Sequence, residues 1–91
     1  MRIFKKSKIP NAMITDCKVY YDGSITIGRD FMKRYNILPD EQVHVLGVNT
    51  KERAITYAIA GDDGVICCNG GLANIFWVGD IVNIVSYEIL P

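Results

Sequence analysis

The chain repeats one pattern of residue types at a spacing of 39 positions. Each copy contains a short strand, a polar residue, a short helix, an acidic turn and an alternating strand. Such a duplication predicts a small, mostly β barrel with pseudo-twofold symmetry, because closing a barrel pairs the edges of many short strands. The positions that match between the two copies are Ile27 with Ile66, Asp30 with Asn69, Glu41 with Asp80, Val43 with Val82, and Val45 with Ile84.

The expected secondary-structure elements are all short. Asp30 is the expected cap of the first helix, whose apolar residues Phe31, Met32 and Tyr35 would face the core. No helix is long enough to connect parallel strands across a sheet, so we do not expect a doubly wound α/β fold. The expected strands cover residues 9–15, 17–21, 25–28, 42–48, 53–60, 65–68 and 81–87, and the expected helices cover residues 31–36 and 72–75.

Composition is typical of one small domain. The chain has 91 residues, of which 49% are apolar, and a domain of this size has a modest core that favours oligomerisation. Ten basic and ten acidic residues argue against a general nucleic-acid binder or a protein of acidic membrane surfaces. No apolar run reaches the length of a membrane span, and the start lacks the pattern of a secretory signal. We therefore expect a cytoplasmic protein.

The cysteines and the single histidine indicate neither a disulfide framework nor a metal site. Cys17, Cys67 and Cys68 are an odd number with one adjacent pair, and His44 has no partner at a metal-ligand spacing. Alternation along a strand places Cys67 and Cys68 on opposite faces, with one of them in the core. The same alternation makes His44 a surface residue.

The segment Tyr21-Asp22-Gly23-Ser24 has two interpretations. Asp-Gly tolerates the backbone of a tight turn, so the segment can join two strands as a β-hairpin. Alternatively, the Gly23–Ser24 bond cleaves itself, because the Ser24 hydroxyl lies next to the preceding carbonyl and glycine accepts a strained backbone there. Elimination and hydrolysis would then leave a pyruvoyl group at residue 24.

Four segments together resemble one known family, the pyruvoyl-dependent aspartate 1-decarboxylases. The resemblance runs in order and with nearly constant spacing over essentially the whole chain. It rests on Tyr21-Asp22-Gly23-Ser24, on Arg53-x-x-Thr56-Tyr57-Ala58-Ile59-Ala60, on Asn69-Gly70, and on Val78-Gly79-Asp80-Ile81-Val82.

The resemblance implies a double-psi β-barrel over residues 1–91 that cleaves itself into a β chain, 1–23, and an α chain, 24–91. It implies a cofactor derived from Ser24, the covalent pyruvoyl group, without pyridoxal phosphate or metal. The pyruvoyl carbonyl would form a Schiff base with L-aspartate, accept the electrons released with carbon dioxide, and yield β-alanine for pantothenate synthesis. The family also implies a homotetramer with active sites between subunits, and a maturation factor can assist cleavage.

The resemblance also assigns roles to individual residues. Ser24 and Tyr57 would be catalytic, with Tyr57 donating a proton after decarboxylation. Thr56 would assist processing by bonding to the Gly23 carbonyl, and it also belongs to the substrate-binding set. The residues expected to bind the two carboxylates of the substrate, or to line it, are Lys8, Arg53, Tyr21, Asn69, Gly70, Gly71 and Leu72.

Several positions depart from the family pattern. Pro10 stands where a histidine is common, Gly28 stands where an acid often follows the serine, and Leu72 interrupts a run of small residues. The chain also ends at Pro91, before the C-terminal extension that is usual in the family. These departures favour an alternative in which a processed relative decarboxylates a different amino acid.

A second alternative is a non-enzymatic binding module. Residues 24–31 followed by residues 37–43 resemble the swapped-hairpin transition-state regulators, which are dimeric DNA-binding proteins built on a related barrel half. Arg29, Lys33 and Arg34 would then face phosphates. Such regulators usually carry one copy of the unit and more positive charge, and they give no reason for Thr56-Tyr57 or Asn69-Gly70.

Overall fold

Seven strands and two short helices make up the chain in the computed structural model, which describes residues 1–91. Neither helix has the length and apolar character needed to cross a membrane. In chain order the elements are β1 (Arg2–Met13), β2 (Asp16–Lys18), β3 (Ser24–Gly28), α1 (Arg29–Tyr35), β4 (Gln42–Gly47), β5 (Arg53–Gly61), β6 (Ile66–Asn69), the 3₁₀ helix η1 (Gly70–Asn74) and β7 (Ile81–Leu90).

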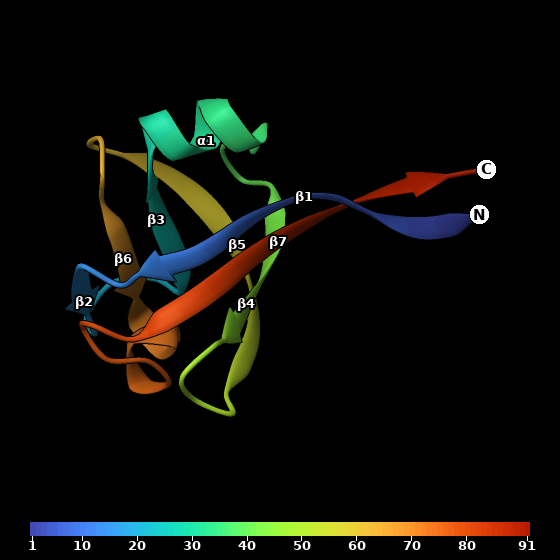
Figure 1. The fold of residues 1–91 in the computed structure, drawn as a ribbon. Coiled ribbons are helices and arrows are strands. Elements are labelled where there is room, and N and C mark those ends of the chain that lie inside the picture. Colours follow the sequence, from blue (N-terminus) through green and yellow to red (C-terminus); the bar gives the residue numbers. More distant parts are fainter.

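All seven strands belong to one sheet, in the order β1-β7-β4-β5-β3-β6-β2. The two strands at the ends of this order, β1 and β2, follow each other directly in the chain (Figure 1). Between them, the Thr15 nitrogen donates a hydrogen bond of 2.8 Å to the Ile66 carbonyl oxygen at the start of β6, which joins the two ends of the sheet. β3 runs antiparallel to β6, and each has a parallel neighbour on its other side, β5 for β3 and β2 for β6. The result is a small double-psi β-barrel, as the family resemblance implied.

Two of the five pairs of residues that the repeat aligns meet in the core of the barrel. Ile27 pairs with Ile66 across β3 and β6, and Val45 pairs with Ile84 across β4 and β7. All four side chains are buried. Because each residue faces its own repeat equivalent, the pseudo-twofold axis passes between the paired strands. The 39-residue repeat is therefore confirmed as a symmetry of the fold.

The interpretation of residues 17–28 as a β-hairpin is wrong. β6 lies between β2 and β3, so these two strands share no hydrogen bonds and the segment between them crosses over the end of β6. Gly70, which follows β6, makes this crossing possible. A Cβ atom on Gly70 would lie 2.8 Å from the Gly23 nitrogen, and its φ of +60° is also in the region that favours glycine.

The expected capping role of Asp30 is also wrong. α1 begins two residues earlier than expected, at Arg29, with Gly28 as its N-cap and no side-chain capping bond. Asp30 lies in the first turn, and its Oδ1 accepts a hydrogen bond of 3.0 Å from the Gly64 nitrogen. The carboxylate thus fastens the helix to the loop before β6. The predicted apolar face is confirmed, because Met32 is buried in the core.

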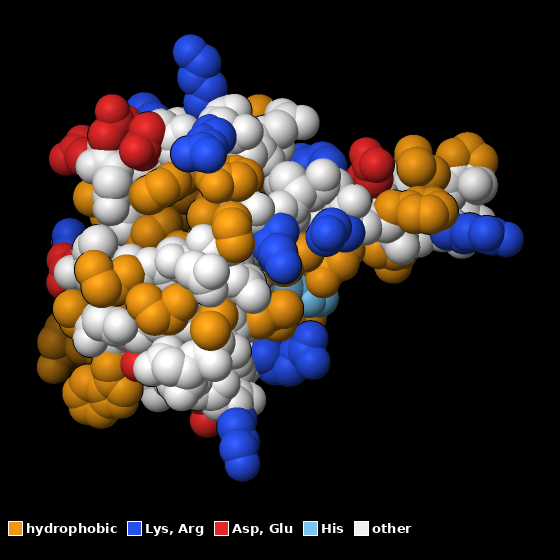
Figure 2. All heavy atoms as spheres, in the orientation of Figure 1, with side chains coloured by type: hydrophobic (Ala, Val, Ile, Leu, Met, Phe, Trp, Pro, Cys, Tyr) orange, Lys and Arg blue, Asp and Glu red, His pale blue; other side chains and the backbone are white.

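β1 and β7 are longer than expected and form a two-stranded arm that projects from the barrel (Figure 1). Pro10 lies at a bulge in β1, where the register shifts between Ile9 and Ala12. This bulge accommodates a residue that cannot donate a ladder hydrogen bond. Hydrophobic side chains are exposed along the arm (Figure 2), among them Ile3, Phe4, Ile89 and Leu90.

Candidate active site

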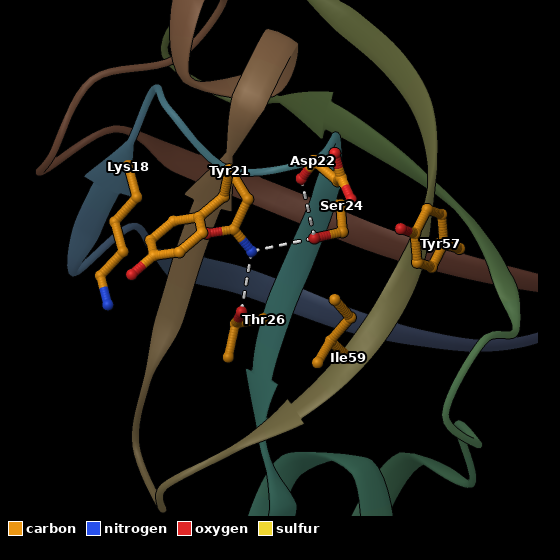
Figure 3. A pocket seen from close by; sticks show the side chains of 8 residues that line it. Lys18, Tyr21, Asp22, Ser24, Thr26, Tyr57 and Ile59 are labelled. Atoms are coloured by element: carbon orange, nitrogen blue, oxygen red, sulfur yellow. Dashed lines mark hydrogen bonds between the residues drawn. The ribbon is translucent and has the colours of Figure 1, made fainter.

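Ser24 is the first residue of β3, and only 1% of its side chain is exposed. Its Oγ accepts a hydrogen bond of 3.0 Å from Asn69 Nδ2 and donates one of 3.4 Å to the Asp22 carbonyl oxygen (Figure 3). A buried hydroxyl needs partners of this kind, since an unpaired one costs about 1–3 kcal/mol. The serine hydroxyl is thus held between the neighbouring strand β6 and the turn that precedes β3.

Asn69 ends β6 directly opposite Ser24 in the antiparallel ladder. Its Nδ2 also donates to Thr26 Oγ1 at 2.8 Å, and its Oδ1 accepts a hydrogen bond of 3.3 Å from the Cys67 thiol. No buried side-chain nitrogen or oxygen in the structure lacks a hydrogen-bond partner. The Asn69 side chain is therefore the centre of a complete network beside Ser24.

The register of the sheet explains why these residues meet. Ile25 and Ala58 pair across β3 and β5 with both side chains in the core. Successive residues of a strand point to opposite faces, so the neighbours of this pair face outward. The outward residues form two rows across the sheet. One row contains Tyr57, Ser24, Asn69 and Lys18, and the other contains Ile59, Thr26, Cys67 and Asp16.

All of these outward residues except Cys67 and Asp16 line a cavity of 330 Å³ at the surface of the barrel. In Figure 3, Tyr57 from β5 and Tyr21 from the crossing segment lie on either side of Ser24. Lys18 is the only cationic residue in the lining, and its Nζ lies 5.3 Å from the centre of the Tyr21 ring. The residues that line the cavity are Lys18, Tyr21, Asp22, Ser24, Thr26, Tyr57, Ile59 and Asn69.

Four residues predicted for the site line this cavity, namely Ser24, Tyr57, Tyr21 and Asn69. Sequence reasoning missed the other four. Thr26 and Ile59 follow Ser24 and Tyr57 by two positions, so strand alternation is a signal that could have found them. Asp22 lies within the motif Tyr21-Asp22-Gly23-Ser24, which is also a signal. Lys18 has no such signal, because only the crossing over β6 brings β2 to the cavity.

The remaining predicted residues lie elsewhere. Lys8 is exposed on β1, and Arg53 lines a different cavity of 360 Å³ beside His44 and Tyr87. The His44 and Tyr87 rings pack against each other with their centres 4.6 Å apart, so His44 is half-buried rather than free at the surface. Thr56 makes no hydrogen bond to Gly23 or Ser24, since alternation along β5 turns it away from Tyr57.

The three residues that follow Asn69, which were predicted to line the substrate, differ in their burial. Gly70 is buried under the crossing segment and Gly71 is exposed at the surface. The side chain of Leu72 is 5% exposed and packs in the hydrophobic core. The side chain of Leu72 is therefore not available to a ligand.

The three thiols are free and held in the neutral form. Burial raises the pKa of Cys67, with the nearby Asp16 carboxylate adding to the effect, and burial raises the pKa of Cys68 to about 12. The pKa of Cys17 is also raised, mainly by burial. Cys68 lies in the core and Cys67 on the outward face, as alternation predicted. No group of three or more histidine, cysteine or acidic side chains could hold a metal ion.

Comparison with known proteins points to a single family. The sequence model of the aspartate decarboxylase family matches residues 1–91. An aspartate 1-decarboxylase of Thermoanaerobacter pseudethanolicus is 47% identical over 91 residues, which cover 98% of this chain and 78% of the relative. The enzyme of the same name from Albidiferax ferrireducens is 40% identical over 93 residues, covering 100% and 69%. That from Campylobacter concisus is 44% identical over 81 residues, covering 89% and 70%.

Proposed function

The chain belongs to the aspartate decarboxylase family, and we propose that it generates its own pyruvoyl group from Ser24 and uses it to decarboxylate L-aspartate. The reaction is that of a carboxy-lyase, with β-alanine and carbon dioxide as products. The observation that carries the assignment of Ser24 is its buried hydroxyl, held by Asn69 at 3.0 Å in a cavity that Tyr57 also lines.

The surroundings of Ser24 fit a residue that is converted into a pyruvoyl group. Gly23, on the other side of the bond, has no atom within 4 Å of the place where a Cβ would lie, so the turn has room to change its geometry. The Asn69 amide presents an N–H donor to the oxygen of residue 24. When formed, the pyruvoyl group supplies an electrophilic carbonyl that takes up the electrons released with carbon dioxide.

Self-cleavage balances without any external oxidant or reductant. The Ser24 oxygen bonds to the Gly23 carbonyl carbon while the C–N bond breaks, and the hydroxyl proton moves to the Ser24 nitrogen. The Ser24 α-proton then leaves and the bond between Ser24 Cβ and the ester oxygen breaks, so that the proton ends on the carboxyl group of Gly23 and dehydroalanine remains at residue 24. Water adds and ammonia leaves, so the pyruvoyl group begins the chain 24–91.

Tyr57 is positioned to supply the proton that replaces the departing carboxyl group. Its side chain lies on β5, beside β3, and 36% of it is exposed to the cavity and to solvent. A phenol held on a strand delivers its proton from fixed geometry, which contributes about 10²-fold or more to the rate. Tyr21 and Ile59 restrict the room around the same point.

We further propose that the complete site forms between subunits of a homotetramer. Lys8 and Arg53, the residues predicted to bind the two substrate carboxylates, do not line the Ser24 cavity of their own chain. Arg53 instead lies beside the exposed apolar arm, where a second copy would cover it. We also propose that the enzyme is cytoplasmic. A maturation factor can accelerate its cleavage.

The comparisons give no support to the two alternatives, a DNA-binding module and a decarboxylase of another amino acid. Activity assays test the proposal directly. The intact protein should release carbon dioxide from aspartate in preference to glutamate and neutral amino acids, and Ser24→Ala should release none. Equal turnover by the Ser24→Ala protein would contradict the assignment of the pyruvoyl group.

A further inference from the structure

We propose that Cys67 is a positioning residue, whose thiol sets the orientation of the Asn69 amide and thereby the direction of the Ser24 hydroxyl before cleavage. The inference rests on the proposed cleavage of the Gly23–Ser24 bond. Cys67 lies on β6 two residues before Asn69, so both side chains point outward on the same face of the sheet. Neither strand alternation nor the family motif predicted this role for Cys67.

The Cys67 thiol has one proton and two acceptors within reach. Its Sγ lies 3.3 Å from Asn69 Oδ1 and 3.9 Å from the Cys68 carbonyl oxygen, so the amide oxygen is the closer acceptor. No other donor in the structure bonds to Asn69 Oδ1. The side chain of Asn69 is only 5% exposed, so water offers little replacement.

The thiol decides between two orientations of the amide. In the present one, both N–H groups of Asn69 are used, by Ser24 Oγ at 3.0 Å and Thr26 Oγ1 at 2.8 Å. After a flip, the amide N–H groups would face the Cys67 sulfur, which is a weak acceptor, and the S–H would keep only the more distant Cys68 carbonyl oxygen. The present orientation therefore has the stronger hydrogen bonds.

The orientation matters for Ser24 because it determines where the hydroxyl proton points. With Asn69 donating to Oγ, the Ser24 O–H is free to donate to the Asp22 carbonyl oxygen, on the side of the chain that precedes the bond to be cleaved. With the amide flipped, the Ser24 O–H would turn to Asn69 Oδ1 instead. The hydroxyl would then be directed away from the peptide that it must attack.

The surroundings of Cys67 keep its thiol a hydrogen-bond donor. The side chain is 3% exposed, and burial together with Asp16 raises its pKa, so the S–H persists at neutral pH. A neutral, buried thiol is a poor nucleophile, which separates this role from covalent catalysis. The requirement at position 67 is therefore a donor of about this size.

Two substitutions separate positioning from packing. Cys67→Ser keeps a donor but places a hydroxyl in a buried position, whereas Cys67→Val keeps an apolar side chain and removes the donor. The measurement is the rate at which freshly purified chains split, followed by mass under denaturing conditions, with unfolding midpoints recorded in parallel. We expect Cys67→Ser to split within about twofold of the unchanged protein and Cys67→Val to split about tenfold more slowly.

The order of the two variants decides the inference. A packing role alone predicts the reverse order, with valine equal to the unchanged protein and serine slower, and that result would overturn the inference while leaving the cleavage intact. An unchanged protein that never splits would overturn the proposed function itself.

A spectroscopic measurement covers the case in which Cys67→Val fails to fold. In the uncleaved Ser24→Ala protein, we expect the infrared S–H stretching band of Cys67, identified by its loss in Cys67→Ser, to move to higher frequency in Asn69→Ala. A band that does not move would contradict the hydrogen bond to Asn69.

Discussion

The chain crosses over the end of a strand at two places, and the two crossings differ in what they carry. The segment before β3 passes over Gly70 at the end of β6, and the loop before β6 passes over Gly28 at the end of β3. At both places a Cβ on the glycine would come within 3.0 Å of the crossing backbone. The two glycines thus permit the crossings of the double-psi barrel, whatever residues surround them.

The difference lies in the residues under each crossing. The first crossing covers the Ser24 hydroxyl, which is 1% exposed and bonded to Asn69. The second carries exposed acids, with Asp30 Oδ1 accepting from the Gly64 nitrogen and Asp63 accepting from the Asp30 nitrogen. One half of a duplicated fold thus buries a serine hydroxyl, and the other half uses the same geometry to fasten a helix.

Alanine at the two crossing glycines tests this comparison with the largest expected effect. Gly70→Ala combines a close contact with a φ of +60°, so we expect a loss of about 3 kcal/mol or more in unfolding free energy, and no cleavage. Gly28→Ala has the close contact but an ordinary φ of −54°, and should lose about 2 kcal/mol while its folded fraction still splits.

Denaturant unfolding of these variants in the uncleaved Ser24→Ala background measures the loss. Gly71→Ala is the matched control, because nothing lies within 4 Å of its Cβ position. If Gly70→Ala were as stable as Gly71→Ala, the crossing would not depend on glycine.

Removing the Tyr57 hydroxyl should affect catalysis and leave cleavage unchanged. We expect Tyr57→Phe to lower kcat for aspartate about 100-fold, because the proposed proton donor is lost while the ring stays beside β3. The fraction of split chain, measured by mass, should equal that of the unchanged protein. A Tyr57→Phe protein with normal kcat would show that the proton comes from another group.

The smallest effect is expected at the second crossing. Asp30→Ala removes the acceptor for the Gly64 nitrogen, which should lower the unfolding free energy by about 1 kcal/mol. Cleavage and aspartate turnover should stay the same, since this crossing carries none of the site. Lys33→Ala, on the same helix, is the control for substitution on α1. Loss of activity in Asp30→Ala beyond its loss of stability would contradict the separation of the two crossings.

Local patterns in the sequence predicted most of the barrel. The 39-residue repeat has a fixed period, and the alternation at Ile25 and Ile27 involves residues close in the chain. The strands and the pseudo-twofold symmetry could therefore be predicted. The order of the strands in the sheet could not be predicted, because nothing near Asp22-Gly23 indicates that β6 inserts between β2 and β3. The same limit affected Asp30, whose partner is the distant Gly64.

Knowledge of the candidate site from the sequence divides in the same way. Ser24, Tyr57 and Asn69 were found through motifs, and the structure places them around one cavity. The pairing of Cys67 with Thr26 across β3 and β6 depends on a register that no motif encodes, so the network behind Asn69 could not be predicted. Lys8 and Arg53 would reach the site only through the contact between subunits that we propose.

The intact mass of the purified protein under denaturing conditions tests the central claim most directly. We predict two fragments, residues 1–23 and a chain 24–91 that begins with a pyruvoyl group. Their summed mass should equal that of the uncut chain plus water minus ammonia. The Ser24→Ala protein should remain whole. A single uncut chain that persists after long incubation, also with a cell extract that can supply a maturation factor, would contradict the account.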